Sequence, residues 1–111
     1  MPKKFISIDL DGVLNNYRGN YEKDKISSLR EGALDFIKKL ASDFNIEIYT
    51  VRDKELVKDW LKENDLIDFV FGITNEKNPK TSIFLDDRAI NFNGDFQCAY
   101  ESIQSFKPHW K

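Results

Sequence analysis

Two acidic side chains, Asp9 and Asp11, stand at the end of the first apolar segment of the chain. Since residues two positions apart on an extended strand point the same way, both carboxylates should face one site. Gly12 follows them and allows the backbone to turn sharply. Two like charges about 4 Å apart repel each other by about 4 kcal/mol at an effective dielectric constant of roughly 20. A group that offsets this repulsion is therefore expected nearby.

A second acidic pair, Asp86 and Asp87, ends another apolar segment, residues 82–85. If the two pairs converge, four carboxylates meet at one place, and a bound cation is the natural way to balance them. No cysteine or histidine lies near either pair in the sequence, and ligand sets made only of oxygen favour Mg²⁺ over Zn²⁺. The sequence thus predicts a Mg²⁺ site.

The composition indicates a single domain without a general affinity for polyanions. The chain has 111 residues, of which 41% are hydrophobic, enough for one core. Its net charge of −2 gives no general attraction to nucleic acid or to anionic membranes, so such a partner would need a local basic patch. With Cys98 as the sole cysteine and no apolar run of about 20 residues, we expect a soluble, cytoplasmic protein.

Strands and helices alternate in the pattern of hydrophobic residues. A capping box formed by Ser28 and Glu31 predicts a helix over the apolar repeat that ends at Phe44, and Asp53 can cap a second helix. The tail, residues 105–111, is polar, and its aromatic rings are expected to patch the edge of the core. Alternation and β-branching predict strands over residues 4–10, 46–50, 69–72, 82–85 and 97–100.

This alternation predicts an α/β fold, an open parallel sheet with helices on both faces. In such sheets the functional site lies beyond the carboxyl ends of the strands, where the strand order reverses. The polar residues of interest all follow predicted strands, which indicates a catalytic or metal-binding cluster. They are Asp9 and Asp11 after the first strand, Thr50 after the second, and Asp86 and Asp87 after the fourth.

The order of these motifs resembles the haloacid dehalogenase superfamily of phosphohydrolases. The matching features are Asp-Leu-Asp-Gly-Val-Leu at residues 9–14, Thr50 after an apolar strand, a lysine, and Leu-Asp-Asp at residues 85–87. Arg88 and Asn91 add a likeness to short, capless members from bacteria and phages. The resemblance implies one Rossmann-like three-layer domain over the whole chain, with a mostly parallel five-stranded sheet of order 3-2-1-4-5. It also implies a small flap at about residues 15–27 in place of a cap domain.

The resemblance also implies a role for each motif residue. Asp9 would attack the phosphorus of a phosphate monoester and form an aspartyl-phosphate. Asp11 would protonate the leaving oxygen and then activate water, so a phosphatase or phosphomutase is expected. Thr50 would donate its hydroxyl to a phosphate oxygen. The Mg²⁺ ligands would be the Asp9 carboxylate, the Asp11 backbone carbonyl and Asp86, with Asp87 bound directly or through water.

The lysine of the third motif is either Lys77 or Lys80. The chain leaves the third strand at the site's end of the sheet and must begin the fourth at the opposite end. About nine linking residues reach at most about 30 Å, so Lys80 should already lie away from the site. We therefore expect Lys77 to bind the phosphate.

Other side chains are weaker candidates. Arg52 and Arg88 are placed to bind substrate, although ion pairs within the protein are the more common role of such arginines. His109 is expected to be a solvated surface residue. The flap side chains that would lie over the site are Asn16, Tyr17, Arg18 and Tyr21.

An open site without a cap suits a bulky phosphorylated macromolecule, or a small phosphate ester covered by a second subunit. Three other functions remain open. A response-regulator receiver uses Asp, Thr, Lys and Mg²⁺ on a similar sheet, but its phosphoacceptor ends the third strand, which here ends in Phe71-Gly72. A non-catalytic binding or regulatory module on the same fold and a nucleic-acid end-processing phosphatase are the alternatives within the resemblance.

Overall fold

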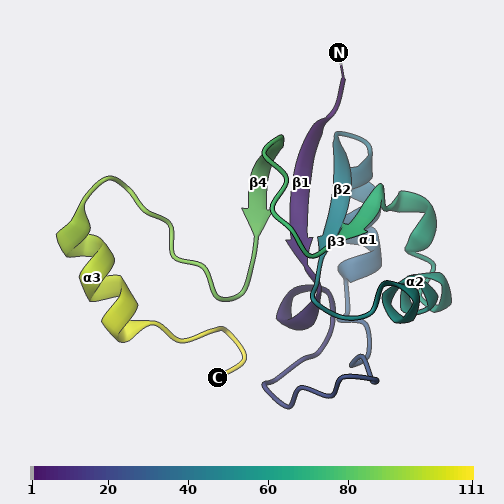
Figure 1. Cartoon of the computed structure of the whole chain (residues 1–111), viewed down its shortest axis with the longest axis horizontal. Helices are drawn as coiled ribbons and strands as arrows, with labels where there is room; N and C mark the ends of the chain where they lie inside the picture. The colour runs from purple at the N-terminus through teal and green to yellow at the C-terminus, as the bar shows by residue number, and fades with distance from the viewer. Residues whose placement is uncertain (1) are drawn as a thin grey trace.

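A four-stranded parallel sheet organises the computed structural model, which describes residues 2–111 (Figure 1). The strands lie in the order β3-β2-β1-β4. The predicted α/β class, the parallel sheet and the order of the first four strands are confirmed, and no cap domain is evident among the described residues. The strands are β1 (Lys4–Asp9), β2 (Phe44–Tyr49), β3 (Gly72–Thr74) and β4 (Thr81–Leu85).

The register of the central strand β1 fixes the position of the acidic residues. Asp9 lies beside Tyr49, the last residue of β2, so Thr50 follows directly at the same edge. On the other side Ile8 pairs with Leu85, the last residue of β4. Because parallel strands end at the same edge, Asp86 and Asp87 leave the sheet next to Asp9.

The core lies between one face of the sheet and two helices, α1 (Ala33–Ala41) and α2 (Lys54–Glu63). Ile8 and Ile48 are fully buried in register on this face, and Ile37 of α1 and Leu61 of α2 pack in the same cluster. Both helices fall on one face because the connections from β1 to β2 and from β2 to β3 run in the same direction, and such crossovers are right-handed.

The helix starts differ in how well the sequence predicts them. Asp53 caps α2 as expected, since its carboxylate accepts a hydrogen bond of 3.1 Å from the backbone N–H of Leu56. The capping box at Ser28 and Glu31 is wrong, because α1 begins only after Gly32. The segment before α1 instead pairs with the segment after β1, through an antiparallel bridge between Leu29 and Asn15.

The predicted fifth strand is also wrong, because residues 96–105 form the helix α3 (Phe96–Ser105). Asp95 caps it by accepting hydrogen bonds from two backbone N–H groups, and side-chain hydrogen bonds from Gln97 to Glu101 and from Gln104 to Tyr100 span single turns. Figure 1 shows α3 apart from the sheet, joined to β4 by an extended segment. The second helical layer, which both the strand–helix alternation and the family resemblance predict, is therefore absent from the described residues.

The connection from β3 to β4 contains no helix. The strand expected over residues 69–72 lies later in the chain, because residues 67–69 form a short turn of 3₁₀ helix and β3 begins only at Gly72. The link that remains, residues 75–80, is shorter than the sequence suggests.

Across the described part of the chain, none of the helices is both long enough and apolar enough to cross a membrane.

Candidate active site

Three carboxylates converge at the edge of the sheet where β1 and β4 end. One oxygen each of Asp9, Asp86 and Asp87 lies within 4.8 Å of the others. Asp9 and Asp87 are half-buried, and Asp86 is exposed. This set of hard oxygen donors fits a divalent cation such as Mg²⁺, which takes carboxylates together with water and phosphate oxygens. The side chain of Asp11 lies outside the cluster.

The three acids cannot all carry a full charge unless something compensates them. Burial raises the pKa of Asp9 to about 8, and a hydrogen bond with Asp87 and the charges of three neighbouring aspartates act in the same direction. Partial burial alone would raise the pKa of Asp87, but hydrogen bonds from the Trp110 indole and from Asp9 outweigh it and lower that pKa. Without a cation, the cluster therefore holds a proton on Asp9 close to neutral pH.

The stability of the metal-free protein should fall as the pH rises. The pKa of Asp9 is about 8 in the folded state and 3.8 ordinarily, so the folded protein binds the proton more tightly. The stabilisation is complete below about pH 4 and disappears as the pH approaches about 8. We expect thermal unfolding in EDTA to show the midpoint falling by roughly 5 °C or more across this range.

Added Mg²⁺ should restore most of that loss near pH 8, because the cation replaces the proton as the partner of Asp9. Asp9→Asn serves as the matched control, since the amide cannot titrate and should give a flatter profile. A midpoint in EDTA that stays level or rises with pH in the unaltered protein would contradict this description of the cluster.

A tight turn, residues 10–14, places Asp11 and Gly12 directly after the strand. Gly12 has φ of 90°, and a Cβ at this position would collide with the carboxylate of Asp87. The buried Asn15 holds the turn, since its side-chain oxygen accepts hydrogen bonds from the N–H groups of Gly12 at 3.0 Å and Tyr17 at 3.1 Å. Sequence reasoning missed Asn15, although its place directly after an apolar run gave a signal.

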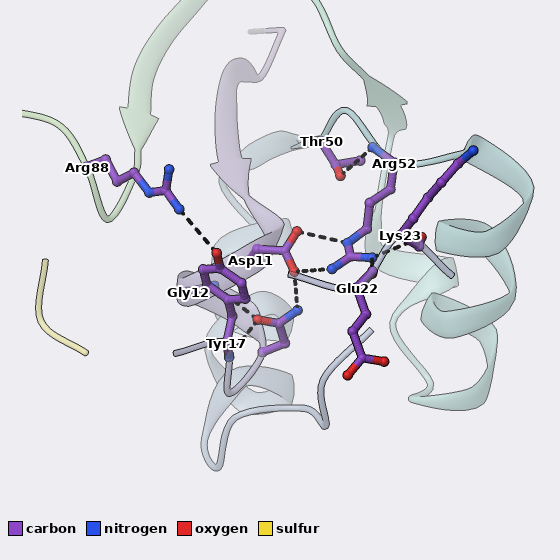
Figure 2. Close-up of polar contacts among 9 residues, drawn as sticks. Asp11, Gly12, Tyr17, Glu22, Lys23, Thr50, Arg52 and Arg88 are labelled. Carbon is purple, nitrogen blue, oxygen red and sulfur yellow. Dashed lines mark hydrogen bonds and ion pairs between the residues drawn. The ribbon is translucent and has the colours of Figure 1, made fainter. Parts of the chain in front are cut away.

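Asp11 points toward Arg52, and the two side chains form a two-pronged ion pair (Figure 2). The Nε–Oδ2 and Nη2–Oδ1 distances are 2.9 and 3.1 Å, and the Arg52 side chain is only 1% exposed. Nη1 of Arg52 donates to the backbone carbonyls of Glu22 and Lys23 in the flap. Of the two roles considered for Arg52, the structure shows the ion pair within the protein, and the guanidinium positions Asp11 and the flap.

The other predicted phosphate-binding residues lie on the walls of the site. Thr50 lines a cavity of about 270 Å³ together with Asp9 and Asp11. Its hydroxyl oxygen accepts a hydrogen bond of 3.1 Å from the backbone N–H of Arg52, which leaves the hydroxyl proton free to donate. Lys77 lines an adjoining cavity of about 200 Å³ that also contains Asp9, and Lys80 does not line it.

The C-terminal tail reaches the site, contrary to the expectation that its rings only patch the core. Trp110 donates its indole N–H to Asp87 at 2.5 Å and packs edge-to-face against Tyr17. His109, expected to be a solvated surface residue, is exposed but contacts the carbonyl of Gly12 at 2.5 Å. The guanidinium of Arg88 lies over the rings of both Tyr17 and Trp110.

Comparison with known proteins gives a likeness in fold alone. No protein-family model matches the sequence, and no curated protein is significantly similar to it. The solved structure of a conserved protein from Bacteroides thetaiotaomicron is similar with a TM-score of 0.59 at 19% sequence identity. The match covers 93% of this chain and 91% of that protein. Identity this low supports the shared α/β architecture and carries no information on activity.

Proposed function

We propose that this chain is a capless, Mg²⁺-dependent phosphatase of the haloacid dehalogenase type. The observation that carries the proposal is the convergence of Asp9, Asp86 and Asp87 at adjoining strand ends. These residues would hold the ion, and bound Mg²⁺ would neutralise the carboxylates and withdraw charge from the phosphate oxygens. Thr50 and Lys77 line the cavities next to Asp9, where the substrate phosphate would bind.

The reaction has two steps in this proposal. An oxygen of Asp9 bonds to phosphorus, the ester P–O bond breaks, and Asp11 gives a proton to the leaving oxygen. Asp11 then takes a proton from a water molecule, whose oxygen attacks the phosphoryl group and frees Asp9 and inorganic phosphate. Both Asp11 oxygens accept hydrogen bonds from Arg52, which fixes the orientation of the carboxylate at the cavity that it lines together with Asp9.

Turnover of p-nitrophenyl phosphate with Mg²⁺ and with EDTA tests this function. We expect hydrolysis with Mg²⁺ that EDTA abolishes and that returns when excess Mg²⁺ is added. Turnover that persists at the same rate in EDTA would overturn the proposal, because the reaction would then not require a divalent cation at the three carboxylates.

The two candidate lysines should differ sharply in the same assay. Lys77 shares a cavity with Asp9 and Asp86, so Lys77→Ala should lower kcat by about 10²-fold, the usual effect of removing one charge-stabilising donor. Lys80 is exposed and does not line either cavity at Asp9, so Lys80→Ala should stay within about twofold of the unaltered protein. The opposite order would show that the phosphate binds elsewhere along the β3–β4 link.

A further inference from the structure

A groove of about 770 Å³ lies beside the acidic site, between the flap and the C-terminal tail. It is strongly basic in a chain whose net charge is −2. Of its ten lining residues, four are cationic and none is acidic. This is the local basic patch that a polyanionic partner requires and that overall composition hides. The cations are Arg18, Arg88, Lys107 and Lys111.

Aromatic rings stand among these cations. Tyr17, Phe106 and Trp110 line the groove, and Tyr17 and Trp110 pack edge-to-face with ring centroids 5.4 Å apart. Gly19 of the flap lies against the Trp110 ring, where a Cβ would come within 3.1 Å of it. Tyr17 is buried, so the rings on which bases can stack are those of the exposed Phe106 and the part-exposed Trp110. Rings beside positive charges are the features with which proteins bind single-stranded nucleic acid, since bases stack on the rings and phosphates contact the charges.

The groove continues into the acidic site. Tyr17 and Arg88 line both the groove and the cavity that contains Asp9, and Figure 2 shows Arg88 directed toward the Tyr17 hydroxyl. A strand whose terminal phosphate lies at Asp9 would therefore continue past Tyr17 and Arg88 into the groove. Arg18, Lys107 and Lys111 line the groove and not the cavity that contains Asp9, so they fit a ligand that carries further phosphates.

We propose that the groove binds the end of a single-stranded nucleic acid and that the terminal phosphate of this strand is the substrate at Asp9. This assignment of the substrate class depends on the phosphatase proposed above, whereas binding in the groove does not. A free sugar phosphate has no further phosphates for the additional cations of the groove. A phosphorylated peptide has no bases to stack on the aromatic rings.

The test measures fluorescence anisotropy of a labelled, terminally phosphorylated oligothymidylate of about ten nucleotides, in EDTA so that binding is separated from turnover. We expect Arg18→Ala combined with Lys107→Ala to weaken binding about tenfold or more. The slope of log affinity against log salt should become shallower by about 1.4, since each neutralised phosphate of a single strand contributes about 0.7. Lys54→Ala combined with Lys58→Ala, on the exposed surface of α2, is the matched control and should bind like the unaltered protein.

Three results would overturn the groove assignment. They are no binding by the unaltered protein, equal binding by the groove and control variants, and competition by inorganic polyphosphate as strong as that by unlabelled oligonucleotide. Hydrolysis of p-nitrophenyl phosphate without oligonucleotide binding removes the groove assignment and leaves the phosphatase. Binding without hydrolysis of either substrate removes the phosphatase and leaves a module that binds nucleic acid.

Discussion

Replacing Asp9 by asparagine should lower kcat by about 10³-fold or more and leave the protein folded. The asparagine amide cannot form the aspartyl-phosphate, and it also removes one of the three carboxylates that converge at the site. In the metal-free protein the change should not lower thermal stability, because burial and the neighbouring charges already disfavour an ionised Asp9. The assay is hydrolysis of p-nitrophenyl phosphate in Mg²⁺, with thermal unfolding measured on the same samples.

Asp59→Asn is the matched control for this experiment, because Asp59 is exposed on α2 and lines neither cavity at Asp9. It makes the same chemical change and should keep full activity. If Asp9→Asn hydrolysed the ester as fast as this control, Asp9 would not be the nucleophile.

Arg52→Ala should have the largest effect on stability, a loss of about 3–5 kcal/mol of unfolding free energy. The buried guanidinium compensates Asp11 and donates to two flap carbonyls, so its removal leaves a partly buried charge and unpaired polar groups. Urea unfolding at neutral pH measures the loss. Activity should fall by about 10²-fold, because Asp11 is no longer held in place.

Arg52→Lys makes this prediction more specific, since an ammonium keeps the charge but cannot make the two-pronged pair with Asp11. It should recover part of the stability and little of the activity. Lys62→Ala, at an exposed position of α2, controls for the loss of a cation. An Arg52→Ala protein within about 0.5 kcal/mol of this control would show that the ion pair is not structural.

Local patterns in the sequence predict the elements that carry the acidic residues. Alternating apolar residues mark β1 and β2, and Asp53 marks the start of α2. Since Asp9 ends β1 and Asp86 and Asp87 directly follow the apolar run of β4, the edge of the sheet where they gather follows from the strand assignments alone. The cluster of Asp9, Asp86 and Asp87 is therefore accessible to sequence reasoning, while the placement of Asp11 against Arg52 is not.

What the sequence does not reveal depends on contacts between distant residues. Trp110 reaches Asp87 and His109 reaches Gly12, and neither pairing leaves a periodic signal. The basic groove collects cations from the flap, from the segment after β4 and from the tail, so the nearly balanced composition conceals it. Residues 97–100 are too few for their periodicity to separate a strand from a helix, and here the cap at Asp95 favours the helix.

A crystal structure of the protein with Mg²⁺ and beryllium fluoride, a mimic of a phosphoryl group, tests the central claim most directly. The proposed mechanism predicts one Mg²⁺ ion bound by Asp9, Asp86 and Asp87, with the fluoroberyllate attached to a carboxylate oxygen of Asp9. A metal bound elsewhere, or a fluoroberyllate absent from Asp9 in crystals that hold Mg²⁺ at the cluster, would contradict it.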